Sequence, residues 1–410
     1  MNRTDQPAAG IKYTLALAFL VAAHSSFAAA QKSVSGEPSA GADSIYQTVG
    51  VRNLLPVFSD SLAARITYPL SWLSGHFRNF DAWKTEARAK VFDCLFRRPP
   101  SVPYYPVVIG EKKRDGYTAR KVVFNITADS RILGYMLVPD GKGPFPAVLL
   151  LHDHGARFDI GKEKVIEPFD GTPEREKSAR EWVDQLYGGR CIGDELAKRG
   201  YVCFAVDALN WSDRGGAGAE GQQAVASNLL NLGSSFAGLI AWEDIAAAEF
   251  LATRPEVDSL RVVSMGLSMG SFRAWQVAAL SDRIAGAVAV CWFATRASLV
   301  VPGGNLTRGQ SAYTTTHPGL AAYLDIPDIA GLACPKPMLF YNGKQDKLFP
   351  VAGVQAGYAK LRAIWDSQNA GDRLVTKLWD VPHVFNREMQ EEAFRWLDQH
   401  FHPVPHSPSK

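Results

Sequence analysis

The stretch Val262-Val263-Ser264-Met265-Gly266-Leu267-Ser268-Met269-Gly270 decides the fold expected for this chain. Val262–Met265 is predicted as a strand and Ser271–Leu280 as a helix, so Gly266–Gly270 lies at a sharp strand-to-helix turn. Its two glycines let neighbouring backbone approach closely, while the turn holds the Ser268 hydroxyl exposed in a strained conformation. The five-residue pattern also occurs by chance in glycine-rich loops, but its position between these elements predicts a nucleophile elbow.

The bulk composition predicts a folded, globular protein. With 410 residues, of which 47% are hydrophobic, the chain could hold one large or two ordinary domains. Lys and Arg total 44 against 41 Asp and Glu, which gives a net charge of +3 without long basic runs. We therefore expect neither nucleic acid nor an anionic membrane surface as a partner.

The N-terminus has the features of a secretory signal peptide. Arg3 and Lys12 accompany the apolar run Tyr13–Ala23, and small residues follow up to Ala30. This order predicts cleavage after Ala30 and export to the periplasm or the medium. The alternative is a retained membrane anchor or a buried helix. The run is shorter than the ~20 residues that a spanning helix needs, so we expect no stable membrane insertion.

Four parts are predicted along the chain: a signal peptide at 1–30, a linker and helical N-terminal extension at 31–115, a catalytic domain at 116–403 and a tail at 404–410. The five cysteines are Cys94, Cys191, Cys203, Cys291 and Cys334. Their spacing forms no C-x-x-C motif, and Cys203 and Cys291 lie within apolar, strand-like runs. We therefore expect no essential disulfide framework.

Predicted strands alternate with predicted helices from residue 120 onward. The first two strands form a hairpin, and the next is an apolar run of the kind that parallel strands buried on both faces produce. The strands are expected at 121–126, 131–138, 146–151, 202–206, 262–265, 284–291, 337–341 and 375–379, and the helices at 80–95, 195–199, 242–253, 269–280, 354–364 and 387–401. Such alternation predicts an α/β fold with a mostly parallel central sheet and helices on both faces.

Three connections, at 156–191, 208–239 and 294–334, are much longer than is usual. Each follows the carboxyl end of a predicted parallel strand, so all three should gather at the edge of the sheet that holds Ser268. We expect them to form long loops over the pocket. The glycine-rich segment Gly215–Ala219 makes the second connection a candidate for mobility, although an ordinary exposed loop fits it equally well.

Two further residues complete a candidate catalytic triad. A serine nucleophile needs a base within hydrogen-bond reach and a third group that orients this base. Asp346 follows the predicted strand 337–341, and His383 follows the predicted strand 375–379. Taken singly, Asp346 could be a turn residue and His383 a loop histidine. All three residues nevertheless stand at strand ends in the order Ser, Asp, His, which favours a triad.

Acyl transfer also needs donors for the oxygen that becomes negative, and these are usually backbone N–H groups. The N–H of Met269, after the elbow, is one candidate, and the N–H of Ala156, after the predicted strand 146–151, is the other. His152 and His154 could instead face one way and hold a metal ion. No third ligand is evident at a compatible spacing, so we expect no metal and no organic cofactor.

Polar and aromatic residues after the strand ends are candidates for substrate contact. Asp207 and Trp292 follow predicted strands directly, and geometry favours them slightly over the rest. The set consists of Asp207, Trp292, Arg157 and Trp211, with Glu163 and Tyr313 as weaker members. Each of them could equally serve packing or loop structure. Arg273, on the predicted helix after the elbow, is expected to pair inside the protein.

Several segments together resemble the dienelactone-hydrolase and acetyl xylan esterase-like branch of the α/β-hydrolase superfamily. They are Arg131–Gly155 ending in Val148-Leu149-Leu150-Leu151-His152-Asp153-His154-Gly155, Arg254–Asp258 leading to Gly266–Gly270, Cys334–Pro337 leading to Gly343–Asp346, and Phe80–Leu95. The resemblance covers roughly residues 80 to 401 and implies the α/β-hydrolase fold. Members of this branch are mostly exported bacterial esterases that act on plant polysaccharides, in agreement with the predicted signal peptide.

Two departures from the resemblance narrow the expected activity. The candidate nucleophile is Ser268, where true dienelactone hydrolases carry a cysteine. Met269 stands where glucuronoyl esterases typically have an arginine, which weakens a uronate-ester assignment. We expect a serine carboxylester hydrolase that forms an acyl-enzyme on a small-molecule or polysaccharide ester. The alternatives are a prolyl-oligopeptidase-like peptidase and a non-catalytic binding protein of the same fold, and no oligomeric state is indicated.

Overall fold

A nine-stranded sheet organises the part of the chain that the computed structural model describes, namely residues 50–52, 54–302 and 312–401. The strand order is β11-β10-β9-β8-β6-β7-β5-β4-β3. The strands are β3 Val107–Arg114, β4 Tyr117–Thr127, β5 Ser130–Pro139, β6 Phe145–Leu151, β7 Val202–Val206, β8 Val257–Leu267, β9 Gly286–Val290, β10 Met338–Gly343 and β11 Leu374–Trp379. In this spatial order, the neighbouring pairs from β11 across to β7, with β6 among them, are parallel. The pairs β7–β5, β5–β4 and β4–β3 are antiparallel.

Alternate side chains of the central strands enter two separate cores, because successive residues of a strand point to opposite faces. In β6, Ala147, Leu149 and Leu151 join one core. Val148 and Leu150 join the other. Burial on both faces explains why β6 and β7 are continuous apolar runs.

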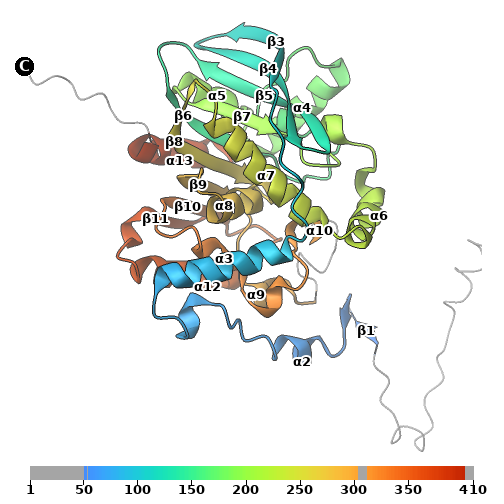
Figure 1. Ribbon diagram of the computed structural model, residues 1–410, viewed down its shortest axis with the longest axis vertical. Coiled ribbons are helices and arrows are strands. Elements are labelled where there is room, and N and C mark those ends of the chain that lie inside the picture. The colour runs from blue at the N-terminus through green and yellow to red at the C-terminus, as the bar shows by residue number, and fades with distance from the viewer. Residues whose placement is uncertain (1–49, 53, 303–311, 402–410) are drawn as a thin grey trace, which may run out of the picture. The chain divides into compact units, whose positions relative to one another are not determined.

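Helices cover both faces of the sheet. They are α2 Ser59–Ala63, α3 Phe80–Cys94, α4 Pro173–Leu186, α5 Ile192–Lys198, α6 Gly218–Asn231, α7 Phe236–Ala252, α8 Met269–Leu280, α9 Arg296–Leu299, α10 Ala312–Thr315, α11 Ile326–Gly331, α12 Val351–Asp366 and α13 Arg387–Phe401. Figure 1 shows α3, α7 and α8 in front of the sheet. Side chains of these helices belong to the first core, whereas α4, α5 and α13 contribute to the second. The predicted fold class is therefore confirmed.

The sequence prediction missed three strands, all before residue 117, and several helices. It placed the first strand after residue 120, whereas β3 begins at Val107. Val107, Val108 and Ile109 are about half exposed at 50%, 48% and 59%, so this edge strand lacks the alternation of a half-buried one. The long connections also contain regular structure, with α4 in the first and α6 in the second.

The predicted signal peptide and most of the linker lie outside the described residues, as do tail residues 404–410. Residues from Val51 onward form one compact unit, which begins with a short antiparallel pair of strands, β1 Val51–Arg52 and β2 Leu55–Pro56. No single helix in the described ranges is long and apolar enough to cross a membrane, although α6 and α7 together pass that test as a pair bent by 82°.

The strand-to-helix turn after β8 depends on close backbone packing. Ser268 has φ 57° and ψ −125°, and its N–H donates to Val290 O on β9 at 2.8 Å. A Cβ atom placed on Gly270 would lie 1.9 Å from Leu151 O, and one on Gly266 would lie 2.4 Å from Gly270. No side chain fits at either position, so the two glycines let α8 start directly against the end of β6.

A buried ion pair fixes α8 to α7. The Arg273 guanidinium donates to both carboxylate oxygens of Asp244, at 3.0 and 2.7 Å, and both side chains are at most 2% exposed. A third bond runs from Arg273 to His152 O at 3.3 Å. The expectation that Arg273 pairs inside the protein is confirmed.

We predict that Gly270→Ala strongly destabilises the fold, because the new methyl group would overlap the Leu151 carbonyl and force β6 and α8 apart. The expected loss is about 3 kcal/mol or more of unfolding free energy, measured by urea denaturation. Gly171→Ala is the control, since a Cβ there meets only ordinary contacts at 3.6 Å and beyond. Equal midpoints for both variants would contradict the prediction.

We also predict that Arg273→Met costs about 3–5 kcal/mol, because it leaves the Asp244 carboxylate buried without its partner. Arg88→Met serves as the control. It breaks an ion pair with Asp282, whose side chain is 85% exposed, and should cost about 0–1 kcal/mol. The two losses are compared by guanidinium denaturation, and a loss at Arg273 no larger than at Arg88 would contradict the assigned role.

Candidate active site

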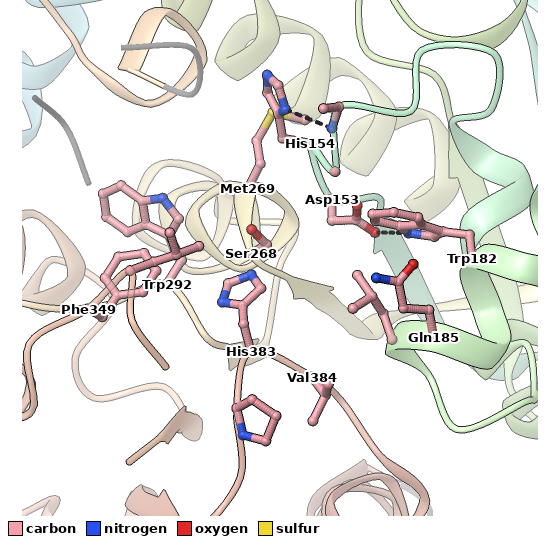
Figure 2. A pocket seen from close by; sticks show the side chains of 15 residues that line it. Asp153, His154, Trp182, Gln185, Ser268, Met269, Trp292, Phe349, His383 and Val384 are labelled. Carbon is pink, nitrogen blue, oxygen red and sulfur yellow. Dashed lines mark hydrogen bonds between the residues drawn. The ribbon is translucent and has the colours of Figure 1, made fainter. Parts of the chain in front are cut away.

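A cavity of about 620 Å³ opens beside the elbow at the carboxyl ends of the parallel strands. Figure 2 shows that its walls come from segments far apart in the sequence. The lining residues are Asp153, His154, Gly155, Ala156, Trp182, Gln185, Leu186, Ser268, Met269, Trp292, Leu348, Phe349, Pro382, His383 and Val384. Six strand-end or connecting segments therefore meet around Ser268, as expected for the ligand-binding edge of an α/β sheet.

His383 and Asp346 form a short hydrogen bond beneath this cavity. His383 Nδ1 lies 2.6 Å from Asp346 Oδ2, and the Asp346 side chain is fully buried, whereas that of His383 is 21% exposed. Leu348 N–H donates to the other carboxylate oxygen at 2.9 Å. A carboxylate partner places the ring proton on Nδ1, which leaves Nε2 as an acceptor. In Figure 2 the His383 ring lies next to the Ser268 hydroxyl, and both line the cavity.

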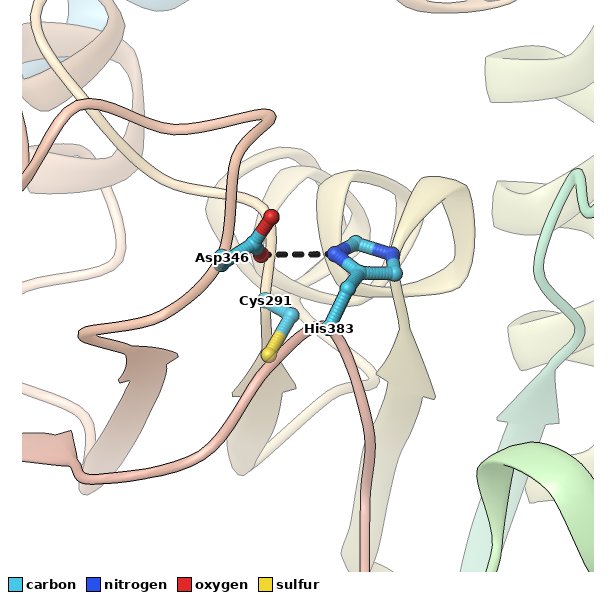
Figure 3. Close-up of side chains that lie close together, drawn as sticks. All are labelled: Cys291, Asp346 and His383. Atoms are coloured by element: carbon cyan, nitrogen blue, oxygen red, sulfur yellow. Dashed lines mark hydrogen bonds and ion pairs between the residues drawn. The ribbon is translucent and has the colours of Figure 1, made fainter.

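Cys291 lies close behind the same pair, and Figure 3 shows the three side chains together. Their donor atoms fall within 4.8 Å of one another, a spacing that could in principle hold a metal ion. The thiol donates instead to Val384 O at 3.6 Å, and burial, with Asp346 adding to it, raises its pKa above the ordinary value. Since the thiolate is the form that binds metals and His383 Nδ1 is already engaged, these residues fit an acid–base pair with a packing cysteine better than a metal site.

His152 and His154 have protein partners at all four ring nitrogens. His152 Nδ1 lies 2.9 Å from Asp153 O, and its Nε2 accepts from Ala208 N–H at 3.0 Å. His154 Nε2 lies 2.8 Å from Gln222 Oε1, and its Nδ1 accepts from Ala156 N–H at 3.2 Å. Burial lowers the pKa of both rings, so both stay neutral. These histidines stabilise the turn after β6 and do not point to a metal centre.

The structure places both predicted oxyanion residues on the cavity wall. Met269 is the first residue of α8, where the N–H groups have no acceptor within the helix. The Ala156 N–H, in contrast, already donates to His154 Nδ1, and the 3.2 Å length makes this a long bond. Gly155 and Ala156 have φ values of 58° and 52°, so the turn is held in the left-handed region.

Of the four predicted substrate contacts, only Trp292 lines the cavity. Asp207 is a buried partner of Lys162 Nζ at 2.7 Å, and Trp211 Nε1 donates to His154 O at 3.0 Å. Arg157 binds Ser178 Oγ at 3.1 Å and Glu181 at 3.4 Å. Glu163 is buried beside Lys162, and Tyr313 packs in a small cluster with Trp211. The long connections fold back on themselves and use these polar groups internally.

The sequence prediction missed the wall formed by α4, which contributes Trp182, Gln185 and Leu186. A signal for this helix was present. Thr172 caps its N-terminus by accepting from Arg175 N–H, and Pro173 occupies the first helical position. Such a Thr-Pro pair typically begins a helix. Phe349 and Leu348, in the turn that follows Asp346, carried no comparable signal.

Comparisons with known proteins agree on the fold. The "Putative hydrolase YtaP" of Bacillus subtilis (strain 168) is 27% identical over 319 residues, which cover 77% of this chain and 99% of that protein. A structure described as a putative acetyl xylan esterase from Bacteroides fragilis superposes with a TM-score of 0.62 at 19% identity, over 81% of this chain and 85% of that one. A glucuronoyl esterase from Solibacter usitatus gives 0.59 at 14% identity, over 80% and 96%.

The structural likenesses, at such low identity, establish the architecture alone. The sequence model of one family goes further, because it matches residues 69–361. This range is well over half of the chain, and it includes Ser268 and Asp346 but ends before His383. The chain belongs to the Abhydrolase family.

Proposed function

We propose that this chain is a serine carboxylester hydrolase that acts through Ser268, His383 and Asp346. The observation that carries the proposal is the 2.6 Å bond between His383 Nδ1 and buried Asp346, beside a serine in a strained turn on the same cavity. A histidine fixed in this way offers Nε2 as a base, and the φ of 57° at Ser268 presents its hydroxyl at the start of a helix.

The proposed reaction has two steps. Ser268 Oγ attacks the ester carbonyl carbon while His383 Nε2 takes the hydroxyl proton, and the alcohol then leaves with that proton to give an acyl-serine. Water attacks the acyl carbon as His383 Nε2 takes one of its protons. The bond between the acyl carbon and Ser268 Oγ then breaks, and Nε2 returns the proton to Oγ, which releases the acid and restores the serine. Asp346 holds the ring and stabilises the imidazolium that forms in each step.

The negative oxygen of each tetrahedral intermediate needs donors, and we assign the N–H groups of Met269 and Ala156 to this task. The Met269 N–H is supported by its place in the first turn of α8, where the helix dipole also favours negative charge. The Ala156 N–H must exchange its long bond with His154 for the oxyanion. A full negative charge is a stronger acceptor than a neutral imidazole, so this exchange is favourable.

The cavity walls suggest a neutral carbohydrate ester as substrate. Trp182 stands on one side of Ser268 and Trp292 with Phe349 on the other, as Figure 2 shows. Aromatic faces of this kind suit sugar rings. The described residues that line the cavity include no Lys or Arg, so these residues offer no lysine or arginine cation to a free carboxylate or phosphate. Acetylated polysaccharide fits these walls, and the predicted export of the chain would bring it to such a substrate.

We predict that Ser268→Ala and Asp346→Asn each lower kcat by at least about a thousandfold, because they remove the nucleophile and the group that orients the base. The measurement is acetate release from acetylated xylan, beside hydrolysis of p-nitrophenyl acetate. Asp380→Asn is the matched control. Asp380 lies three residues before His383, and its exposed carboxylate accepts a hydrogen bond from Gln345. It should leave both rates unchanged.

Unchanged turnover in Ser268→Ala would overturn the proposed function. Hydrolysis of p-nitrophenyl acetate without acetate release from xylan would keep the mechanism and contradict the carbohydrate substrate. Activity of the wild type on neither ester would contradict both.

We predict a separate effect for Gln185, whose exposed amide is the polar group that α4 offers to the cavity. Gln185→Ala should raise KM for acetylated xylo-oligosaccharides by about three- to tenfold, the loss of one hydrogen bond, and leave p-nitrophenyl acetate unaffected. Asp184→Ala, on the same helix but outside this cavity, is the control. Equal KM values for all three proteins would show that α4 does not bind the sugar.

A further inference from the structure

The short 3₁₀ helix η2 Lys162–Lys164 contains two fully buried lysines, Lys162 and Lys164. Lysine is almost never fully buried without a partner, because its charge loses hydration. The Lys162 ammonium is surrounded by carboxylates, with Asp207 and Asp213 each at 2.7 Å. Its role is to hold the connection after β7. The surroundings of Lys164 are different.

The Lys164 ammonium binds the backbone of the turn after β6. It donates to Asp153 O and to His154 O, each at 3.0 Å, and lies 3.5 Å from Asp153 Oδ1. Burial lowers the pKa of Lys164, while the Asp153 carboxylate opposes this shift. The same ammonium lies 5.3 Å from the centre of the Trp182 ring.

Neighbouring groups brace this arrangement from both sides. Trp211 Nε1 donates to His154 O at 3.0 Å, so that carbonyl accepts two bonds. Asp153 Oδ2 accepts from Trp182 Nε1 at 3.1 Å, a bond drawn in Figure 2, and from Tyr187 Oη at 2.8 Å. The turn is thus fixed through two carbonyl groups and through the Asp153 carboxylate by buried side chains.

We propose that Lys164 is a positioning residue for the oxyanion donors. In a trans peptide the C=O and N–H groups point in opposite directions, so a carbonyl held by Lys164 turns the following N–H the other way. Lys164 thereby orients the peptide units that carry the N–H groups of His154 and Gly155. The Ala156 N–H belongs to the next peptide unit, so its direction depends on the turn that these two units fix. Gly155 and Ala156 both line the cavity. The ammonium keeps the turn in its left-handed conformation before substrate arrives, which is what preorganised donors require. This inference rests on the proposed function and deepens it.

The test compares Lys164→Met with Lys162→Met. Both variants remove a fully buried ammonium from η2, but only the first loses contact with the oxyanion turn. We expect Lys164→Met to lower kcat on p-nitrophenyl acetate by about ten- to a hundredfold with KM within about twofold, because donors act mainly in the transition state. Lys162→Met should lose a similar amount of thermal stability and keep kcat within about threefold.

A second variant covers the case in which Lys164→Met does not fold. Trp211→Phe keeps an aromatic ring in place but removes the other donor to His154 O. It should lower kcat by about three- to tenfold, again with little change in KM. Unchanged kcat in folded Lys164→Met, or in Trp211→Phe when the lysine variant cannot be purified, overturns the inference.

Ser268→Ala is assayed alongside these variants, because it distinguishes failure of the positioning role from failure of the proposed function. If it abolishes turnover while the Lys164 variant keeps its full kcat, only the positioning role is wrong. If it keeps full activity, the proposed function and the positioning role both fail.

Discussion

The contact between Gly270 and the Leu151 carbonyl is the constraint on which the candidate site depends. A Cβ on Gly270 would lie 1.9 Å from that oxygen, so α8 can start against β6 only because the side chain is missing. Leu151 is the last residue of β6 and directly precedes the turn at 152–156. Gly270 follows Ser268 by two residues. One backbone contact therefore sets the separation between the candidate nucleophile and the turn that carries a candidate oxyanion donor.

Behind this contact, buried charges hold the strand-end segments in place. Arg273 connects α8 to Asp244 on α7 and to His152 O in the turn. Lys164 binds the next two carbonyls of the same turn. Groups of this kind are costly to bury and are tolerated when every partner is present. The edge of the sheet that carries the candidate site is thus held by buried charged groups, which limit how far its backbone can move.

The sequence predicted those features that depend on hydrophobic periodicity or on the residue types at strand ends. The parallel strands, the helices that follow them and the proximity of Asp346 to His383 all follow from residues that obey local rules. Contacts within the long connections were not predictable in this way. Asp207 and Trp211 stand at suitable places for substrate contact, yet Lys162 and the His154 carbonyl engage them. Tertiary packing determines which side chains contact each other in connections of about thirty residues or more. No short sequence pattern predicts these contacts.

The wall formed by α4 has a consequence for how such a protein can change over time. This helix lies in the connection between β6 and α5, and none of the candidate catalytic residues lies within it. Substitutions on its cavity face at Gln185 and Leu186 can therefore change the shape of the cavity without replacing the serine, the histidine or the aspartate, whereas Trp182 also donates to Asp153 in the turn after β6. One wall of the cavity and the candidate triad thus lie in separate segments of the chain, so duplicated copies could change the shape of the cavity by substitutions in one helix.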